Sequence, residues 1–467
     1  MKNRIGLLVL LMGLSVIHQT EAELYADFVT PKGAFSVQLS VLDSPRAVAN
    51  FMGLVSGVQT WRDPVMGVVY GGQEEEAASF YQGMCFYATE GSRVLLGGLR
   101  SYIGTDGYEY WEGPGYTILD EVDNGIRLAY GTLVMPEFNG PHSGGGELGI
   151  ILTNQVGYVG SGWTAFGVVQ AMDMPVVEAV AAEINAGSRI AVEIMIRDEF
   201  STPEERAALA AAKMELPVLV AMPLELNMEG ERGISFQMSS HSQACLAATP
   251  GLVTNRWQVL PGMWELGESP TSMKVPFASI PGLAEHQGFI SGSEAVYPKM
   301  TAKWFPEKMR LAVEHTGVHM QYWLDFTAGT GIWARVENGI PVENGVLSSL
   351  TQSIETANSL RIVFVIGMTA YYYWLGMDEQ GAQLGRFYNQ QWYWNAELVG
   401  EDNGMFEYAE GWGDTNARIP RVRTCGVTPL FRHPDWAPAS REKTRMGKPI
   451  LPLGGLDLIS EGKNQTE

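Results

Sequence analysis

Short apolar runs alternate with glycine-rich turns along residues 24–196, and this pattern predicts a small β domain with few helices. One exception is the segment 43–57, which has helical periodicity and a proline placed for the first turn. Either Asp43 or Ser44 can cap this helix. Its predicted apolar face consists of Val48, Phe51, Met52 and Val55. A second predicted helix, 174–187, ends on a glycine suited to a left-handed C-cap.

The segment 198–216 is the best candidate for a linker between two halves of the chain. Thr202, Pro203 and Glu205 follow the pattern of a capping box, with a hydroxyl at the N-cap and a carboxylate three residues later. An alanine-rich run comes next. We therefore expect a helix that separates an N-terminal domain, 23–197, from the rest of the chain.

Beyond residue 216 the pattern changes to short aromatic or β-branched segments separated by glycine, asparagine and proline. Residues 217–440 are therefore predicted to form a second β-rich domain, either a barrel or a sandwich. The uncharged run Ile362–Met377 is marginal in length for a membrane span, and Gly367 and Gly376 interrupt it, so we expect two strands there. The polar tail, 441–467, is expected to be loose.

The N-terminal residues 1–22 have the anatomy of a secretory signal peptide. Lys2 and Arg4 precede the apolar run Ile5–Ile17, and small or polar residues follow. This run is shorter than the roughly 20 residues that a membrane-spanning helix needs, which disfavours an uncleaved anchor. We expect export to the periplasm or the extracellular space, with no membrane span in the mature chain.

The length of 467 residues, with 46% apolar and 18% charged residues, is enough for two globular cores. A net charge of −21 repels phosphate backbones and anionic lipid, so nucleic-acid binding is not expected. Three cysteines are too few for a disulfide scaffold or a zinc site. In an exported protein Cys245 could pair with Cys425, and Cys85 would then be a small buried hydrophobe.

Metal ions and cofactors are not expected. His315 and His319 have the spacing of ligands on a helix, but Gly317 and the strand-like surroundings argue against a helix there. The acidic run Glu74–Glu76 is interpreted as a solvated loop, with weak Ca²⁺ binding as the alternative.

A series of motifs follows in a fixed order between Leu24 and Gly187. They are F-V-T-P-K-G-A-F-S-V-Q-L, S-P-R-A-V-A-N-F-M-G-L-V-S-G, F-Y-Q-G-M-C-F, G-G-L-R, G-P-G-Y-T-I-L-D-E, Y-G-T-L-V-M-P-E and W-T-A-F-G-V-V-Q-A-M-D-M-P-V-V-E-A-V. Together they resemble the cyclophilin-type peptidyl-prolyl cis-trans isomerases. The resemblance implies an eight-stranded antiparallel barrel capped by two helices.

The same resemblance implies that the catalytic side chains of the family are replaced. In cyclophilins an arginine donates a hydrogen bond to the proline amide, and two glutamines and a backbone segment hold the peptide. Here Ala88 occupies the arginine position and Leu96 the position of the first glutamine. The other groove positions of the family fall on Arg93, Val94, Pro136, Glu137, Leu148, Ile150, Tyr158 and Trp163.

Within that set, Arg93 and Val94 replace a phenylalanine and a methionine of the pocket. Leu148 and Ile150 are assigned to the second glutamine and the second phenylalanine. Tyr158 and Trp163 take the places of a tryptophan and a histidine. The pair Pro136 and Glu137 replaces the alanine and asparagine that bind the peptide backbone in the family.

Arg93 is the candidate for a substitute catalytic arginine, because it is expected across the turn from Ala88 on the neighbouring strand. A displacement of about 1 Å from the productive position can cost on the order of 100-fold in rate. A solvated surface arginine is therefore the preferred interpretation of Arg93.

Three functional hypotheses result. The preferred one is an exported protein whose isomerase domain is weak or inactive and acts as an interaction module for a proline-containing peptide or protein segment. Its apolar groove could hold a peptide, dock the second domain or fill itself. The second is an active divergent isomerase that assists the folding of exported proteins. The third is a surface or carbohydrate-binding protein that uses aromatic segments such as Tyr371–Trp374 and Trp392–Trp394 of the C-terminal half.

Overall fold

The computed structural model describes most of the chain between Leu24 and Gly411. The described residues are 24–64, 67–72, 78–90, 94–103, 109–122, 124–137, 142–154, 163–197, 202–228, 232–249, 258–259, 263–265, 269–280, 289–298, 308–315, 318–326, 328–337, 340–356, 358–378, 381–388, 391–402 and 405–411. The predicted signal peptide, the acidic run Glu74–Glu76, the polar tail and Cys425, and with it the proposed disulfide, lie outside them.

The N-terminal domain is an antiparallel sheet that curls into a barrel, with strand order β12-β5-β6-β10-β9-β11-β2-β1-β13. Its strands are β1 (Leu24–Thr30), β2 (Gly33–Leu39), β5 (Cys85–Glu90), β6 (Val94–Gly97), β9 (Thr132–Met135), β10 (Leu148–Ile151), β11 (Thr164–Val169), β12 (Ile190–Ala191) and β13 (Glu193–Arg197).

One bent strand closes this barrel. The two ends of the strand order, β12 and β13, are separated in the chain by Val192 alone. Ile190 pairs with Phe86 of β5, whereas Met195 pairs with Asp27 of β1. Because β12 and β13 are two halves of one strand, the nine described segments make an eight-stranded barrel, which confirms the predicted architecture.

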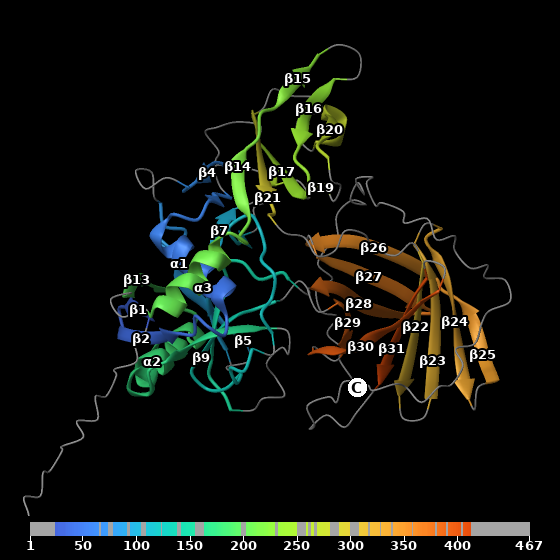
Figure 1. The fold of residues 1–467 in the computed structure, drawn as a ribbon, viewed down its shortest axis with the longest axis horizontal. Helices are drawn as coiled ribbons and strands as arrows, with labels where there is room; N and C mark the ends of the chain where they lie inside the picture. Colours follow the sequence, from blue (N-terminus) through green and yellow to red (C-terminus); the bar gives the residue numbers. More distant parts are fainter. Residues whose placement is uncertain are drawn as a thin grey trace, which may run out of the picture.

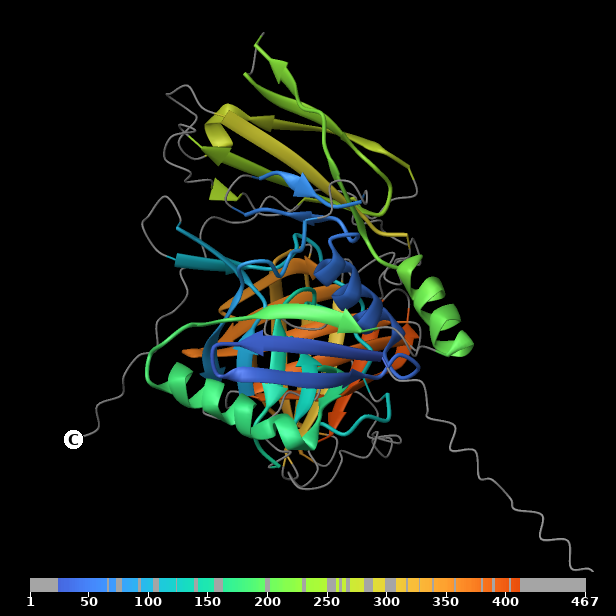
Figure 2. The ribbon, with the colours of Figure 1, turned by 90° about the vertical axis from the view of Figure 1, so that its left-hand side faces the viewer.

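Two helices, α1 (Pro45–Ser56) and α2 (Met174–Asn185), cover opposite ends of the barrel, as Figure 2 shows. Both predicted helices are thus confirmed, and Gly187 has the left-handed φ of 89° expected after α2. Aromatic rings fill the space between strands and helix. Phe28 stacks on Phe35 with ring centroids 4.9 Å apart, and Phe51 of α1 lies 5.6 Å from Phe166.

The N-terminus of α1 is capped from outside the helix. Ser44 occupies the N-cap position, but its hydroxyl donates instead to the Ala165 carbonyl oxygen at 2.6 Å. The Glu121 carboxylate accepts from the backbone N–H of Arg46 at 3.0 Å and of Ala47 at 2.8 Å. A distant carboxylate therefore satisfies two amides that a local cap would satisfy, and it ties the segment 113–122 to the helix.

The third helix, α3 (Pro203–Lys213), begins with the predicted capping box. The Thr202 side chain accepts from the Glu205 backbone N–H at 3.1 Å, and the Glu205 carboxylate accepts from the Thr202 backbone N–H at 2.8 Å. This helix packs against α1 and buries Leu209 and Ala212. It is therefore part of the N-terminal core and not a free connection.

Residues 218–297 form two small sheets that share one core. The larger has the order β14-β21-β17-β18 with β19 beside β17, and the smaller has the order β15-β16-β20. Side chains of β16 and β17, among them Phe236 and Leu246, meet in a common cluster, so this part is a sandwich. Its strands are β14 (Val218–Ala221), β15 (Glu225–Asn227), β16 (Gly233–Met238), β17 (Ser242–Thr249), β18 (Gln258–Val259), β19 (Met263–Glu265), β20 (Thr271–Pro276) and β21 (Phe289–Val296).

Residues 308–411 form a ten-stranded sheet, the C-terminal sheet, seen at the right of Figure 1. Its strands are β22 (Lys308–His315), β23 (Val318–Asp325), β24 (Thr330–Glu337), β25 (Ile340–Val346), β26 (Ser349–Thr356), β27 (Ser359–Ile366), β28 (Thr369–Asp378), β29 (Gly381–Tyr388), β30 (Gln391–Asp402) and β31 (Met405–Gly411).

The C-terminal sheet closes on itself in the same way as the N-terminal barrel. Its two edge strands, β25 and β26, follow each other in the chain. The backbone N–H of Leu347 donates to the Gly331 carbonyl oxygen of β24, and that of Ser348 donates to the Val365 carbonyl oxygen of β27. β25 and β26 thus act as one bent strand that pairs with β24 on one side and with β27 on the other. Counted in this way, the closed sheet has an odd number of strands in up-and-down order. This explains why β22 and β31 run parallel.

The second half therefore contains both architectures that the sequence left open, a sandwich and a barrel. The uncharged run from Ile362 forms β27 and β28, as predicted, with Gly367 at the left-handed turn position. Phe364 and Tyr373 stack inside the barrel with centroids 5.6 Å apart. Among the described helices, none has the length and apolar character needed to cross a membrane.

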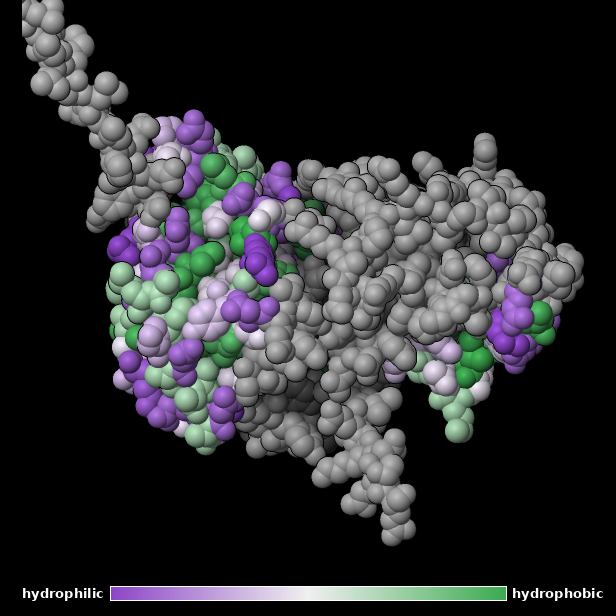
Figure 3. All heavy atoms as spheres, turned by 90° about the horizontal axis from the view of Figure 1, so that it is seen from below, coloured by the Kyte–Doolittle hydropathy of each residue, from purple (hydrophilic) through white to green (hydrophobic). Residues whose placement is uncertain are grey.

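The remaining elements are short. They are the strand pairs β3 (Trp61–Arg62) with β4 (Val69–Tyr70) and β7 (Arg100–Ile103) with β8 (Glu109–Glu112), and the 3₁₀ turns η3 (Ala171–Asp173) and η5 (Phe277–Ser279). Viewed from below, the described surface of the N-terminal domain mixes hydrophilic and hydrophobic residues (Figure 3).

The external cap of α1 gives a first prediction. Glu121→Ala leaves two helix amides without their acceptor, so we expect a loss of about 1–2 kcal/mol in the free energy of unfolding. Urea denaturation followed by circular dichroism measures this loss. The control is Glu183→Ala on α2, whose carboxylate pairs with Lys32 at the surface and whose loss should leave the midpoint unchanged. Equal midpoints for both variants would contradict the capping role.

Candidate functional site

The candidate site lies on the outer face of the barrel, where β5, β6 and β10 run side by side. Ala88 of β5 pairs directly with Leu96 of β6, and a register shift lies between Phe86 and Ala88. Directly opposed residues of an antiparallel pair project to the same face of a sheet. The two positions that the resemblance assigns to the family's arginine and first glutamine are therefore neighbours here, and both side chains are apolar.

Strand β10 adds to the same face. Gly149 pairs with Leu96, and Ile151 pairs with Val94. These contacts join a compact group that we call the outer apolar cluster. Its buried members are Val94, Leu96, Val134, Ile151, Trp163 and Ala165, with Tyr87, Ala88, Ile126 and Leu128 partly buried against them. The structure thus brings together Ala88, Val94, Leu96 and Trp163 of the predicted groove.

Leu148 and Ile150 do not belong to this face, which corrects the sequence-based assignment by one residue. Ile150 pairs with Leu95, and both are fully buried in the barrel interior together with Leu148. Because side chains alternate along a strand, a shift of one residue exchanges the two faces. The residues of β10 that share the outer face with Val94 and Leu96 are Gly149 and Ile151. The longer connection before Leu148 hid this register in the sequence.

The outer apolar cluster is filled by its own side chains. Val94 is 2% exposed, Trp163 is 6% and Leu96 is 7%. An open site for a proline ring would leave such residues accessible to solvent. Of the other predicted groove residues, Arg93 and Tyr158 lie outside the described residues.

An aromatic stack borders the cluster. Tyr87 lies 4.3 Å from Trp111 between ring centroids, and the Arg189 guanidinium lies 4.9 Å above the Trp111 ring. The Tyr87 hydroxyl donates to the Glu147 carboxylate. Burial and this neighbouring carboxylate raise the pKa of the Tyr87 hydroxyl well above its ordinary value, so it remains a donor. The sequence alone gave no sign of this stack, because its members are far apart in the chain.

Glu137 turns away from the cluster and into a buried polar network. Its side chain is 4% exposed and interacts with the Asp120 carboxylate, while Oε1 has no hydrogen-bond partner. Burial, followed by the charge of Asp120, raises the pKa of Glu137 well above its ordinary value. Glu137 is thus favoured in its protonated form, and its side chain is directed to Asp120 and away from the outer apolar cluster.

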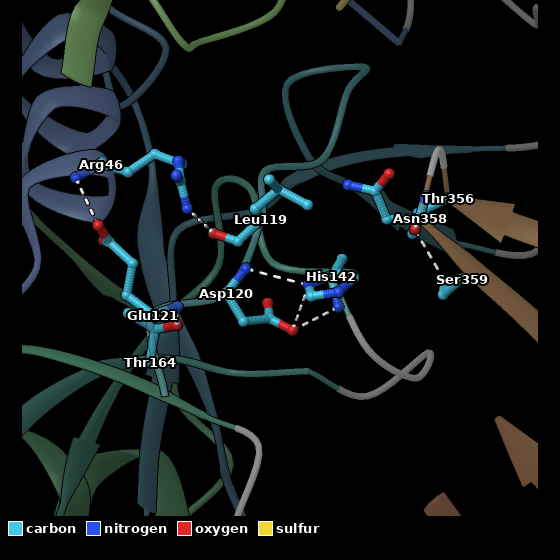
Figure 4. A network of polar contacts seen from close by, with 9 residues as sticks. All are labelled: Arg46, Leu119, Asp120, Glu121, His142, Thr164, Thr356, Asn358 and Ser359. Carbon is cyan, nitrogen blue, oxygen red and sulfur yellow. Dashed lines mark hydrogen bonds and ion pairs between the residues drawn. The ribbon is translucent and has the colours of Figure 1, made fainter. Parts of the chain in front are cut away.

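His142 also belongs to this network, and Figure 4 shows it beside Asp120. Its Nδ1 lies 2.8 Å from Asp120 Oδ2 and 3.1 Å from the Asp120 backbone nitrogen. The residue has a left-handed φ of 59°, an uncommon conformation for a side chain other than glycine. A small cavity of about 20 Å³ adjoins the imidazole. It is lined by Thr117, Ile118, Leu119, His142, Glu215, Pro217, Tyr297, Thr356 and Asn358.

The other sequence candidates find no support as sites. His315 ends β22 and His319 lies in β23, where it pairs with Glu314, so the two histidines are on strands and not on one helix. Within the described residues, no group of three or more histidine, cysteine or acidic side chains could hold a metal ion. Tyr373 is fully buried inside the C-terminal sheet, so its ring is not available to stack on a sugar.

These features define a class: a small antiparallel barrel closed by two helices, with an apolar face on three adjacent strands. Comparison with known proteins identifies the family. Residues 25–198 match the model of cyclophilin type peptidyl-prolyl cis-trans isomerase/CLD. Peptidyl-prolyl cis-trans isomerase B of Streptomyces anulatus is 27% identical over 161 residues, which are 34% of this chain and 85% of that relative.

Two solved structures of a cyclophilin type isomerase from Cryptosporidium parvum are also similar, each at 16% identity and a TM-score of 0.27. One covers 39% of this chain and 99% of its own, and the other, in the presence of dipeptide ala-pro, covers 37% and 98%. By its family-model match and topology, the N-terminal part of this chain is a cyclophilin-type peptidyl-prolyl cis-trans isomerase domain, followed by β-rich sheets.

The outer apolar cluster gives a second prediction. Trp163→Ala removes the largest side chain of a closed cluster, so we expect the free energy of unfolding to fall by about 3–5 kcal/mol. The matched control is Trp111→Ala, which removes a half-buried tryptophan from outside the cluster and should cost less. Urea denaturation of both variants measures the difference. A smaller loss for Trp163→Ala than for Trp111→Ala would show that the cluster is not closed.

Glu137 gives a prediction with a definite pH dependence. Its pKa is higher in the folded than in the unfolded chain, so the wild type loses stability as pH rises from about 4.5 toward the folded-state value. Glu137→Gln cannot ionise. We therefore expect equal stability near pH 4.5 and a more stable variant at pH 8, by on the order of 1 kcal/mol.

Thermal and urea denaturation at pH 4.5, 6 and 8 test this expectation. Glu193→Gln, on the exposed face of β13, is the control that changes one carboxylate without changing the network. A Glu137→Gln difference that stays constant across this pH range would contradict a raised pKa for Glu137.

Proposed function

We propose that the cyclophilin-type domain of this protein is a weak or inactive prolyl isomerase that acts as an interaction module. The observation that carries this proposal is the pairing of Ala88 with Leu96 inside a closed apolar cluster. These are the positions that the family resemblance assigns to its arginine and first glutamine.

The chemistry of the reaction explains why this replacement matters. The barrier to rotation about a peptide bond is about 18–20 kcal/mol, and an enzyme lowers it with a donor placed for the twisted amide. Ala88 and Leu96, at the positions that the resemblance assigns to the arginine and the first glutamine, have no side-chain donor to offer. The Tyr87 hydroxyl of the outer apolar cluster is directed to Glu147, and Trp163, at the position that the resemblance assigns to a histidine, is 6% exposed.

Contacts with the rest of the chain support the interaction role. The Gln59 side chain donates to the Pro217 carbonyl oxygen at 2.6 Å, and the Leu219 backbone N–H donates to the Thr60 hydroxyl at 2.7 Å. The Ser291 hydroxyl donates to the Gly67 carbonyl oxygen at 2.8 Å. The first partner of the module is thus the β-sandwich of the same chain. A proline-containing segment of another protein would bind only if Trp163 and Leu96 moved apart.

The alternative is that the divergent domain is an active isomerase in which Arg93 serves as the catalytic arginine. Arg93 directly precedes Val94, the first residue of β6 and a member of the outer apolar cluster. A guanidinium there could reach the face of the cluster from the turn and donate to a bound amide. This alternative predicts activity that depends on Arg93.

We also propose that the protein is exported to the periplasm or the extracellular space. The basic residues Lys2 and Arg4 followed by the apolar run Ile5–Ile17 support this proposal. Mass spectrometry of the secreted protein should find a mature N-terminus near residue 23. A retained Met1 in the exported fraction would contradict cleavage.

A coupled prolyl isomerisation assay on the full chain tests the main proposal. Loss of one preorganised donor costs about 100-fold to 1,000-fold in rate, so we expect kcat/KM for an Ala-Pro tetrapeptide at least about 100-fold below that of an active cyclophilin measured in parallel. Any residual rate should be the same in wild type and in Arg93→Ala.

The control for this assay is Arg127→Ala, which removes another arginine from an exposed position. A rate close to that of the active cyclophilin, lost in Arg93→Ala and retained in Arg127→Ala, would overturn the proposal and establish the active alternative.

A further inference from the structure

The turn between β26 and β27 is buried, although connections between strands normally lie at the protein surface. Thr356 and Asn358 are each 2% exposed, and Ser359 is fully buried. The next turn of the same sheet, between β27 and β28, is different, because Met368 there is fully exposed. Burial is therefore not a general property of the turns of this sheet, and another part of the chain covers the β26–β27 turn.

Hydrogen bonds within the turn hold its shape. The hydroxyl oxygens of Thr356 and Ser359 lie 2.7 Å apart, and the Asn358 backbone N–H donates to the Thr356 hydroxyl at 3.2 Å. Polar groups that are buried without a partner cost free energy, and these contacts give partners to two hydroxyls and one amide. The turn can therefore enter a buried contact as a preorganised unit.

The surface that faces the turn belongs mainly to the N-terminal domain. Thr356 and Asn358 line one side of the small cavity beside His142, as Figure 4 shows. We call the other side the turn recess. It is formed by Thr117, Ile118, Leu119 and His142 of the N-terminal domain, by Glu215 and Pro217 after α3, and by Tyr297 after β21. The cavity between the two sides is only about 20 Å³, so the contact is close.

Contacts within the N-terminal domain shape the turn recess. The Ile118 backbone N–H donates to the Gly144 carbonyl oxygen at 2.9 Å and ties two segments of the wall together. Arg46 of α1 pairs with Glu215 at 2.7 Å and donates to the Leu119 carbonyl oxygen at 3.5 Å. These contacts do not involve the turn. The recess is thus built before the turn enters it, which lowers the entropic cost of the contact.

The turn recess adjoins one end of the outer apolar cluster. A side chain at Gly149 would meet Val94 at 3.1 Å and Pro136 at 3.3 Å, so Pro136 lies beside the cluster. Glu137 follows Pro136 and interacts with the backbone of His142, a residue of the recess. Pro136 and Glu137 are the positions that the family resemblance assigns to contacts with the peptide backbone. The turn therefore docks where the resemblance expects a peptide.

We propose that the β26–β27 turn is an intramolecular ligand of the cyclophilin-type domain: it fills the turn recess and excludes a peptide of another protein from that end of the groove. This inference rests on the proposed interaction role of the domain and names the C-terminal sheet as its partner. A ligand in the same chain can have an effective concentration on the order of millimolar. A free peptide of weak affinity therefore does not displace the turn.

Thiol labelling of the full chain tests whether the turn is docked. Asn358→Cys places a thiol in the buried turn, and the matched variant Met368→Cys places one in the exposed turn of the next hairpin. A buried thiol reacts only when a local opening exposes it, so we expect a bulky maleimide to label Asn358→Cys at least about tenfold more slowly than Met368→Cys. Peptide mapping by mass spectrometry separates these sites from the natural cysteines.

A second substitution, on the other side of the contact, shows what covers the turn. Leu119→Arg adds volume and charge to the closed recess, so in its presence we expect Asn358→Cys to be labelled at least about tenfold faster. The control Val168→Arg places the same side chain at an exposed position of β11 and should leave the labelling rate unchanged. Circular dichroism checks that each variant is folded.

Either of two results would overturn the docked turn. One is an equal labelling rate for Asn358→Cys and Met368→Cys. The other is a labelling rate of Asn358→Cys that Leu119→Arg does not change. If Leu119→Arg does not fold, Thr117→Arg, at a partly exposed position of the same recess, replaces it in the second comparison.

The labelling rates do not depend on isomerase activity, so this inference and the proposed function can fail separately. An active isomerase with a shielded Asn358→Cys thiol would contradict the weak isomerase and retain the docked turn. A weak isomerase whose Asn358→Cys thiol reacts as fast as that of Met368→Cys would contradict the docked turn and leave the proposal of a weak isomerase in place.

Discussion

The pairing of β6 with β5 on one side and with β10 on the other determines what the N-terminal domain can do. This double register places Ala88 opposite Leu96 and Gly149 opposite Leu96 on its other side. The side chains that β6 and β10 present to the outer face follow from it, because side chains alternate along each of these strands. The face is apolar because of the residues at these positions, and the barrel that carries them is the barrel of an isomerase family.

A second constraint shapes both ends of the molecule. A curved sheet has edges that must be paired or covered, and here one bent strand serves two neighbours in each barrel. Val192 marks the bend in the N-terminal barrel, and residues 347–348 mark it in the C-terminal sheet. In both barrels one strand with a short break pairs with the two strands that would otherwise be the edges of the sheet. The sheet therefore closes without an additional strand.

Features that depend on a few adjacent residues could be predicted from the sequence. The helices, the capping box at Thr202 and the turn at Gly367 each follow from a few adjacent residues. The strand pair around Ala88 followed from the family resemblance. The register of β10 did not, because a longer connection before Leu148 shifts it by one residue. The interaction of Glu137 with Asp120 could not be predicted from the sequence either, because folding brings these separate segments together.

The buried carboxyl pair of the N-terminal domain lies outside the outer apolar cluster. Burial of two carboxyl groups close together is costly. Yet Glu137 and Asp120 are buried together beside His142, at the contact with the C-terminal sheet and a short distance along the chain from the outer apolar cluster. A buried network with one unsatisfied oxygen lowers the free energy of unfolding. The unfavourable burial of this network is therefore located where the N-terminal domain meets the C-terminal sheet, and not at the outer apolar cluster.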